Sequence, residues 1–132
     1  MKQLFDTNIL VDETLEDSER HTLATKLFDE SETIILPRVV LLEYVWVMLK
    51  RVKAPPDFLV EKVSEYRSDA RVNFYCETED DVKLALLIMK REKMPASAFN
   101  DCLLLAIAKN NKAEILTFDD ELKGIARKYV TK

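Results

Sequence analysis

The sequence contains almost no glycine, and Gly124 is its single example among 132 residues. Glycine-rich turns hold phosphates in P-loop and Rossmann-type nucleotide-binding proteins, so both kinds of fold lose most of their support. Histidine is equally scarce, since His21 stands alone in a polar segment. A histidine general base, a histidine metal triad and a Ser-His-Asp triad are therefore nearly excluded, because each needs residues that the chain lacks.

Cysteine is also rare, and Cys76 and Cys102 do not form a C-x-x-C pair. Each lies in an apolar segment, which predicts free, buried thiols in a reducing compartment. The longest nearly continuous apolar run, residues 39–49, is interrupted by Glu43 and is too short to cross a bilayer. The N-terminus lacks the long apolar region of a secretory signal. We therefore expect a cytoplasmic protein with no membrane span.

Positive charge is not in excess, because 20 Lys and Arg residues face 24 Asp and Glu residues, for a net charge of −4. This balance disfavours a general nucleic-acid coat protein, which needs a strongly basic face. It does not exclude an enzyme that acts on nucleic acid, since carboxylates that hold cations add negative charge that the metal cancels. The basic residues that would line a groove, or form solvated helix ends, are Lys50, Arg51, Lys53, Lys90, Arg91 and Lys93.

Short β-branched or aromatic segments alternate with longer, helix-like segments along the whole chain. Strands are expected at residues 2–5, 33–36, 71–76 and 114–118. Helices are expected at residues 19–29, 39–51, 57–68, 79–93, 101–110 and 120–128. This order implies right-handed crossovers in one α/β domain spanning residues 1–132. We expect a three-layer α/β/α sandwich with a mostly parallel sheet of four to five strands.

Acidic residues occupy the carboxyl ends of expected strands, where sheets of this kind bind ligands. Asp6 directly follows the first expected strand, and Asp119 directly follows the last. Aspartate is also a favoured cap or turn former at such junctions, so neither residue alone proves a site. Asp120 would replace Asp119 if the strand ended one residue later. Asp12 and Asp81 fit surface positions better.

Two further carboxylates accompany strongly apolar helices. Glu43 interrupts an apolar run, and a buried lone carboxylate must be neutralised, paired or bound to a cation. The alternative is a narrow exposed stripe that Glu43 shares with Lys50. Asp101 stands at the head of the apolar segment 102–108, where either it or Asn100 would serve as an N-cap.

Convergence of Asp6, Glu43, Asp101 and Asp119 at one sheet edge would create strong mutual repulsion. The four groups would not all stay ionised without cations among them, and ligands that are all oxygen select Mg²⁺ or Mn²⁺. Such a centre lowers the pKa of a bound water and stabilises the leaving oxygen of a phosphodiester. The pattern therefore favours metal-dependent hydrolysis of a phosphodiester bond.

These residues and their surroundings resemble the PIN-domain family, and the resemblance covers essentially the whole chain. The matching segments are Asp6-Thr7-Asn8, Pro37-Arg38-Val39-Val40-Leu41-Leu42-Glu43, Asn100-Asp101-Cys102-Leu103-Leu104-Leu105-Ala106-Ile107-Ala108 and Leu116-Thr117-Phe118-Asp119. The size resembles that of stand-alone VapC-type toxins of prokaryotic toxin–antitoxin pairs. The resemblance implies an α/β/α sandwich, metal-dependent endoribonuclease activity and frequent homodimers. It also implies inhibition by a cognate antitoxin whose tail enters the acidic groove.

The resemblance implies roles for the acidic residues. Asp6 and Asp101 match the principal metal ligands of the family, and Glu43 completes the set. Asp119 matches the fourth acid, which often reaches the metal through water. The chain ends soon after the last expected helix, so the usual fifth strand of the family is expected to be short or missing.

Two polar residues match positions that orient the carboxylates or the bound water in the family, namely Asn8 and Thr117. A turn former and a strand-end hydroxyl would leave the same pattern. The expected helix at residues 39–51 has more apolar residues than one core-facing stripe requires. The excess indicates either dimerisation or coverage by other helices of the same chain, and it consists of Val45, Trp46, Met48 and Leu49.

Three other functions are weighed against a nuclease. A haloacid-dehalogenase-like phosphatase also begins with a strand and an aspartate and uses Mg²⁺, but it needs a second aspartate where this chain has Asn8. A receiver-type signalling domain needs an acidic pair near the first strand, which this chain lacks. A catalytically degenerate PIN-like module that binds RNA or protein is the third, and the presence of all four acids disfavours it.

Overall fold

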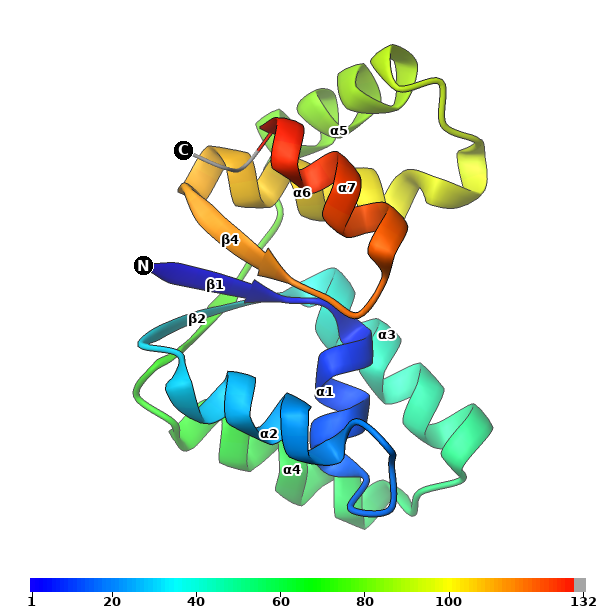
Figure 1. Ribbon diagram of the computed structural model, residues 1–132. Coiled ribbons are helices and arrows are strands. Elements are labelled where there is room, and N and C mark those ends of the chain that lie inside the picture. The colour runs from blue at the N-terminus through cyan, green and yellow to red at the C-terminus, as the bar shows by residue number, and fades with distance from the viewer. Residues whose placement is uncertain (130–132) are drawn as a thin grey trace.

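A parallel sheet of four strands forms the middle layer of the computed structural model, which describes residues 1–129 (Figure 1). The strands are β1 (Lys2–Phe5), β2 (Thr33–Pro37), β3 (Val72–Tyr75) and β4 (Ala113–Leu116). They lie in the order β3-β2-β1-β4, and every pair is parallel. The predicted fold class, an α/β sandwich around a mostly parallel sheet, is thus confirmed.

Helices form the two outer layers. They are α1 (Thr7–Thr14), α2 (His21–Glu30), α3 (Arg38–Val47), α4 (Pro56–Ser68), α5 (Glu79–Arg91), α6 (Phe99–Asn111) and α7 (Asp120–Tyr129). A π-helical turn, Met48–Val52, extends α3, and a 3₁₀ turn, Ala96–Ala98, precedes α6. Figure 1 shows α5, α6 and α7 on one side of the sheet and α1, α2 and α4 on the other.

The central strand β1 determines where the site lies. Leu4 and Phe5 are fully buried, and Leu4 pairs with Ile35 of β2 and Ile115 of β4. The chain passes from β1 to β2 on one side, and it reaches β4 on the other side only after every other strand is complete. This change of direction beside β1 is the type of switch point at which α/β sheets bind ligands.

Helix α6 is the most buried helix of the domain, as its apolar sequence predicts. All seven residues from Cys102 to Ala108 are buried. The helix packs against α5 on one side and against β1 and β4 on the other. This packing fixes the first turn of α6, which carries Asp101, next to the end of β1.

The element ends differ from the predictions by a few residues, and one helix was not predicted. Helix α1 is short and polar at its end, and it depends on capping by Asp6, whose side chain accepts a hydrogen bond from the first helical N–H. The last strand ends at Leu116, so Asp119 follows a short loop and not the strand itself. The expected short or missing fifth strand concerns residues 130–132, which lie outside the described residues.

Two predictions about burial were wrong. Cys102 is buried as expected, but Cys76 is exposed, because it lies where the chain leaves β3 toward α5. Asp81, expected at the surface, is fully buried at the start of α5. Within residues 1–129, no helix is long and apolar enough to cross a membrane.

Candidate active site

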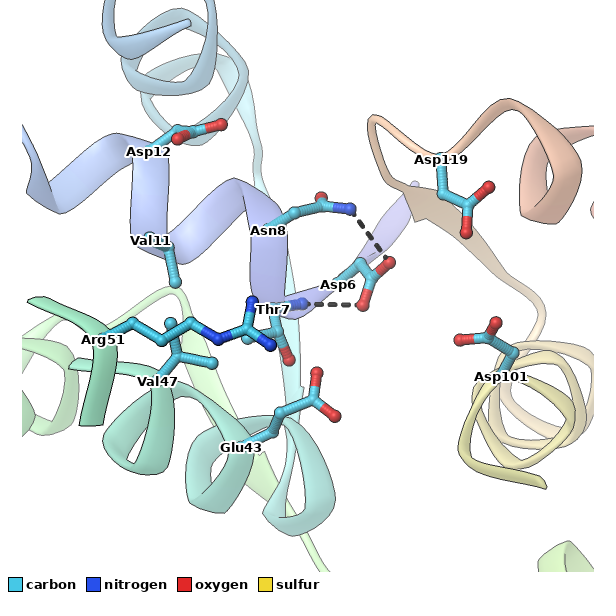
Figure 2. A pocket seen from close by; sticks show the side chains of 10 residues that line it. All are labelled: Asp6, Thr7, Asn8, Val11, Asp12, Glu43, Val47, Arg51, Asp101 and Asp119. Atoms are coloured by element: carbon cyan, nitrogen blue, oxygen red, sulfur yellow. Dashed lines mark hydrogen bonds between the residues drawn. The ribbon is translucent and has the colours of Figure 1, made fainter. Parts of the chain in front are cut away.

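A pocket of about 380 Å³ opens beside the carboxyl ends of β1 and β4. Figure 2 shows the side chains that line it: Asp6, Thr7, Asn8, Val11, Asp12, Glu43, Val47, Arg51, Asp101 and Asp119. The structure therefore brings to one place all four acids that the sequence singles out. They come from the end of β1, from α3, from α6 and from the loop before α7, so only the tertiary fold joins them.

Asp6 is held in a fixed orientation at the floor of this pocket, where it is only 8% exposed. Its Oδ1 accepts a hydrogen bond of 2.7 Å from the backbone N–H of Thr7. Its Oδ2 accepts hydrogen bonds from the hydroxyl of Thr117 (2.7 Å) and the side-chain amide of Asn8 (3.3 Å). The pKa of Asp6 is raised above its usual value, because the effect of burial outweighs the hydrogen bonds from Thr117 and Thr7, which lower it.

Asn8 and Thr117 also connect the two loops that carry Asp6 and Asp119. The Oδ1 of Asn8 accepts a hydrogen bond from the backbone N–H of Phe118 (3.2 Å), and its amide donates to the hydroxyl oxygen of Thr117 (3.2 Å). That oxygen also accepts from the backbone N–H of Asp119 (3.0 Å). Both residues thus contact Asp6 directly, and their proposed orienting role rests on these contacts.

Asp119 directly precedes α7, caps its first turn and faces the pocket with one of its oxygens uncommitted. Its Oδ1 accepts hydrogen bonds from the backbone N–H groups of Glu121 (3.0 Å) and Leu122 (3.3 Å). Asp120 lies outside the pocket, where its 97% exposed side chain pairs with Lys123. The geometry therefore favours Asp119 over Asp120 as the fourth acid.

Asp101 has the most perturbed carboxyl group of the pocket. Its pKa is raised to about 6, mainly by burial in the first turn of α6 and in addition by the negative charges of Asp6, Asp119, Glu43 and Glu121. The N-cap of α6 is Ala98, so Asp101 does not serve as the cap that its position allowed. Its carboxylate accepts no hydrogen bond from any of residues 1–129 and is available to a ligand.

Glu43 is exposed, so the expectation that it is buried inside an apolar helix was wrong. Helix α3 lies at the rim of the domain, and it exposes Leu42 (61%) and Trp46 (53%) beside Glu43. The exposed-stripe alternative is therefore correct for its burial. Along this helix Glu43, Val47 and Arg51 recur every four residues, which places them on one face, and all three line the pocket.

Glu77, which helps to position α3, was not predicted from the sequence, and Asp12, expected at the surface, lines the pocket. Glu77, in the loop after β3, accepts a hydrogen bond of 2.7 Å from the backbone N–H of Val39 and so caps the start of α3. No local sequence pattern predicts this contact, because it joins segments that are distant in the sequence. Asp12 lines the pocket one turn after Asn8 and accepts a hydrogen bond of 2.8 Å from Ser18. The spacing of Asn8 and Asp12 would have revealed this position had α1 been recognised.

The acids share one pocket without being gathered into a ligand cluster. In the part of the chain that is described, no three Asp, Glu, His or Cys side chains lie in positions to hold a metal ion as they stand. The chemistry of the donors nonetheless fits a hard cation, because every candidate ligand is a carboxylate oxygen. Burial is the main cause of the raised pKa of Asp101, and the negative charges of Asp6, Asp119 and Glu43 add to it.

Comparison with curated proteins finds no match in sequence. Among solved structures, the fold is similar to VapC20 of Mycobacterium tuberculosis, described as a toxin that cleaves the sarcin–ricin loop, with a TM-score of 0.78 and 17% identity over 92% of this chain and 93% of that one. It is also similar to VapBC2 from Rickettsia felis, solved with a DNA fragment from its promoter, with a TM-score of 0.67 and 18% identity over 94% of this chain and 92% of that one. The family model of the PIN domain matches residues 4–128. The chain therefore belongs to the PIN domain family.

Proposed function

We propose that this chain is a metal-dependent endoribonuclease that hydrolyses phosphodiester bonds of single-stranded or structured RNA. The observation that carries the proposal is the convergence of Asp6, Glu43, Asp101 and Asp119 on one pocket at the switch point of the sheet. A site whose burial and charge already raise the pKa of Asp101 to about 6 gains from a divalent cation, which relieves the repulsion. Mg²⁺ is the expected ion, and Mn²⁺ is expected to substitute.

The four carboxylates have different parts in this proposal. Asp6 would hold the ion in a fixed direction, because Thr7, Asn8 and Thr117 already determine the orientation of its carboxylate. Asp101 and Glu43 would complete the ligand set with carboxylates that no described residue occupies. When bound, Mg²⁺ supplies positive charge that stabilises the charge developing on the phosphate as the bond breaks.

Asp119 would orient the attacking water. Its Oδ1 accepts hydrogen bonds from the start of α7, and its other carboxylate oxygen is free to accept a hydrogen bond from a water in the pocket. The backbone N–H of Asp119 donates a hydrogen bond to the Thr117 hydroxyl, which itself donates to Asp6, so Thr117 links the positions of Asp119 and Asp6. The pair thus places a water and a metal ligand on the same side of the pocket.

We also propose that the chain is the toxin of a toxin–antitoxin pair and acts in the cytoplasm. This is supported by the likeness to two VapC-type structures, one of them described as a toxin. A cognate antitoxin would inhibit by placing its tail in the acidic pocket. Co-purification with the product of the neighbouring gene tests this part, and a neighbour that neither binds nor inhibits contradicts it.

We propose a homodimer from the apolar surface of α3 and the π-helical turn. Trp46 (53%) and Leu49 (43%) are exposed and Val45 is partly covered, whereas Met48, expected in the same surface, is buried in the core. A second copy would remove this surface from water. Light scattering should give the mass of a dimer for the wild type and of a monomer for Leu49→Glu. A monomeric wild type would contradict the dimer.

The experiment that tests the nuclease is cleavage of a mixed single-stranded RNA pool with Mn²⁺ and with EDTA. We expect metal-dependent cleavage that Asp101→Asn abolishes. Asp120→Asn is the matched control, because it removes the same charge from the adjacent surface, and it should retain cleavage. A rise in melting temperature with Mn²⁺ reports metal binding independently of cleavage.

Three outcomes would contradict the proposal. Cleavage that survives in Asp101→Asn would come from a contaminant or another site. Cleavage that persists in EDTA would contradict the proposed dependence on a metal ion. Metal binding without cleavage of any RNA would point to a catalytically degenerate module that binds RNA or protein.

A further inference from the structure

Arg51 differs in charge from every other residue that lines the acidic pocket. Among the lining residues it alone is positively charged, whereas five carry carboxylates. It lies on the π-helical turn Met48–Val52, on the same face as Glu43 and Val47. Figure 2 shows its side chain crossing the pocket wall with the guanidinium directed toward Thr7. A single cation thus projects into a site that is otherwise acidic.

The guanidinium of Arg51 is not committed to any of these carboxylates. Within residues 1–129 it forms no ion pair, and its contact is with the ring of Trp46, whose centroid lies 5.9 Å from Cζ. Arg71 shows the contrast, because it donates to both carboxylate oxygens of Asp69 and to the backbone carbonyls of Phe28 in α2 and Ser31 just after it. Arg71 therefore has a structural role, whereas the donors of Arg51 are free for a ligand.

The chemistry of Arg51 matches one ligand class in particular. A guanidinium donates paired hydrogen bonds to phosphate oxygens, and it keeps its charge at any pH of interest. The carboxylates of the pocket repel a phosphodiester, so an RNA strand needs a positive contact besides the metal to enter. The neighbouring aromatic ring restricts the guanidinium without neutralising it.

Resting on the proposed nuclease function, we propose that Arg51 binds a backbone phosphate of the RNA strand beside the phosphate that is cleaved. The contact holds the strand on the α3 side of the pocket, opposite Asp101 and Asp119. It concerns the backbone, so it acts on RNA of any sequence. Arg51 is then a substrate-binding residue of a site in which Asp6, Glu43, Asp101 and Asp119 serve the metal and water.

The test measures binding of a labelled single-stranded RNA oligonucleotide by fluorescence anisotropy, in Mg²⁺ over a series of salt concentrations. Asp101→Asn serves as the background, because it should bind without cleaving. We expect Arg51→Met to weaken binding roughly tenfold, as the loss of one charge-assisted contact does. The slope of log affinity against log salt should fall by about 0.7, the value for one phosphate contact on a single strand.

Lys50→Met is the matched control, because it removes the same charge from an exposed neighbour outside the pocket. It should leave the slope unchanged, and Arg51→Lys should keep the slope while binding more weakly than arginine. In the protein with Asp101 intact, Arg51→Met should raise KM more than it lowers kcat. Equal melting temperatures would show that these variants fold alike.

The outcomes separate this inference from the proposed function. If the protein binds and cleaves RNA but Arg51→Met behaves like Lys50→Met, the phosphate contact is overturned and the nuclease is not. If Arg51→Met lowers the melting temperature with KM unchanged, Arg51 only offsets the charge of the acids, and the contact is again overturned. If the wild type neither binds nor cleaves RNA in Mn²⁺, both fail.

Discussion

The hydroxyl of Thr117 donates a hydrogen bond of 2.7 Å to Oδ2 of Asp6, across 111 positions of sequence. The two residues meet because β1 and β4 pair in parallel, with Phe5 opposite Leu116 at their carboxyl ends. The backbone N–H of Asp6 also donates to the carbonyl of Leu116 (3.0 Å). The orientation of a candidate metal ligand is therefore a direct result of strand pairing.

Replacing Thr117 by valine should impair both the site and the fold. The change removes the donor to Asp6 and the acceptor used by Asn8 and by the backbone of Asp119. We expect a loss of about 1–3 kcal/mol in the free energy of unfolding, since buried polar groups lose their partners. Cleavage should fall roughly 10- to 100-fold, as for other residues that orient metal ligands. Urea denaturation and RNA cleavage measure the two effects.

Thr117→Ser is the control for this prediction. Serine keeps the hydroxyl and loses only a methyl group, so most of the cleavage should return. Equal activity of the valine and serine variants would show that the hydrogen bond to Asp6 does not matter for the reaction.

Asp101→Asn should stabilise the metal-free protein at neutral pH. The folded state raises the pKa of this carboxyl from 3.8 to about 6, first by burial and then by nearby negative charges, so ionisation disfavours folding. Below about pH 4 the group is protonated in both states, and the variant should gain nothing. Above about pH 6 we expect a gain of about 1–2 kcal/mol, a value reduced for the partial exposure of the group.

Thermal melts in EDTA across this pH range provide the measurement, with Asp120→Asn as the surface control. A gain of equal size at every pH would contradict the assigned cause. Added Mn²⁺ should reverse the order of stability, because it stabilises the wild type more than the variant.

Glu43→Leu should leave the stability of the metal-free protein within about 0.5 kcal/mol, as is usual for an exposed position. A buried Glu43 would instead have predicted a clear gain, because a costly charge would be removed. Glu43→Gln should nevertheless lower cleavage at least roughly a hundredfold if the residue is a metal ligand. Denaturation curves and cleavage assays on both variants test the separation of the two effects.

Asp81→Asn should destabilise the fold without touching the pocket. Desolvation raises the pKa of Asp81, but hydrogen bonds from the Tyr75 hydroxyl (2.6 Å), the backbone of Thr78 and the amide of Asn110 outweigh it and lower the pKa below 3.8. An asparagine presents an amide to some of these donors. We expect a loss of about 1–3 kcal/mol near neutral pH.

The stabilisation that Asp81 provides should depend on pH. A lowered pKa means that the stabilisation is present above pH 3.8 and is lost as the pH falls through the lower value of the folded state. The difference between wild type and Asp81→Asn should therefore shrink in acid. Denaturant midpoints that differ by the same amount at about pH 3 and about pH 7 would contradict it.

Local patterns in the sequence were enough to predict most elements. Strand Lys2–Phe5 and the α6 region were predicted from their local composition. The expected start of α5 at residue 79 also agrees with the structure, in which Thr78 and Asp81 form a capping box there. Helix α1 was missed because its eight residues carry a weak apolar pattern, and a cap from Asp6 and packing against α2 and α3 stabilise it.

Some features of the candidate site could likewise be predicted from the sequence, and others could not. The positions of Asp6, Glu43, Asp101 and Asp119 relative to strand ends and apolar helices are visible in the sequence, because periodicity and junctions are local properties. The exposure of Glu43 and the burial of Asp81 were not, because each depends on which other segments cover the element.

The sequence by itself therefore determined the alternation of strands and helices, the oxygen-only chemistry of the candidate ligands and the family resemblance. Only the tertiary structure decided that Thr117 would meet Asp6, that Glu77 would cap α3 and that an uncommitted Arg51 would face the acids. The physical reason is that parallel pairing and helix packing bring together groups from distant segments. Their distances, burial and charge interactions exist only once the chain has folded.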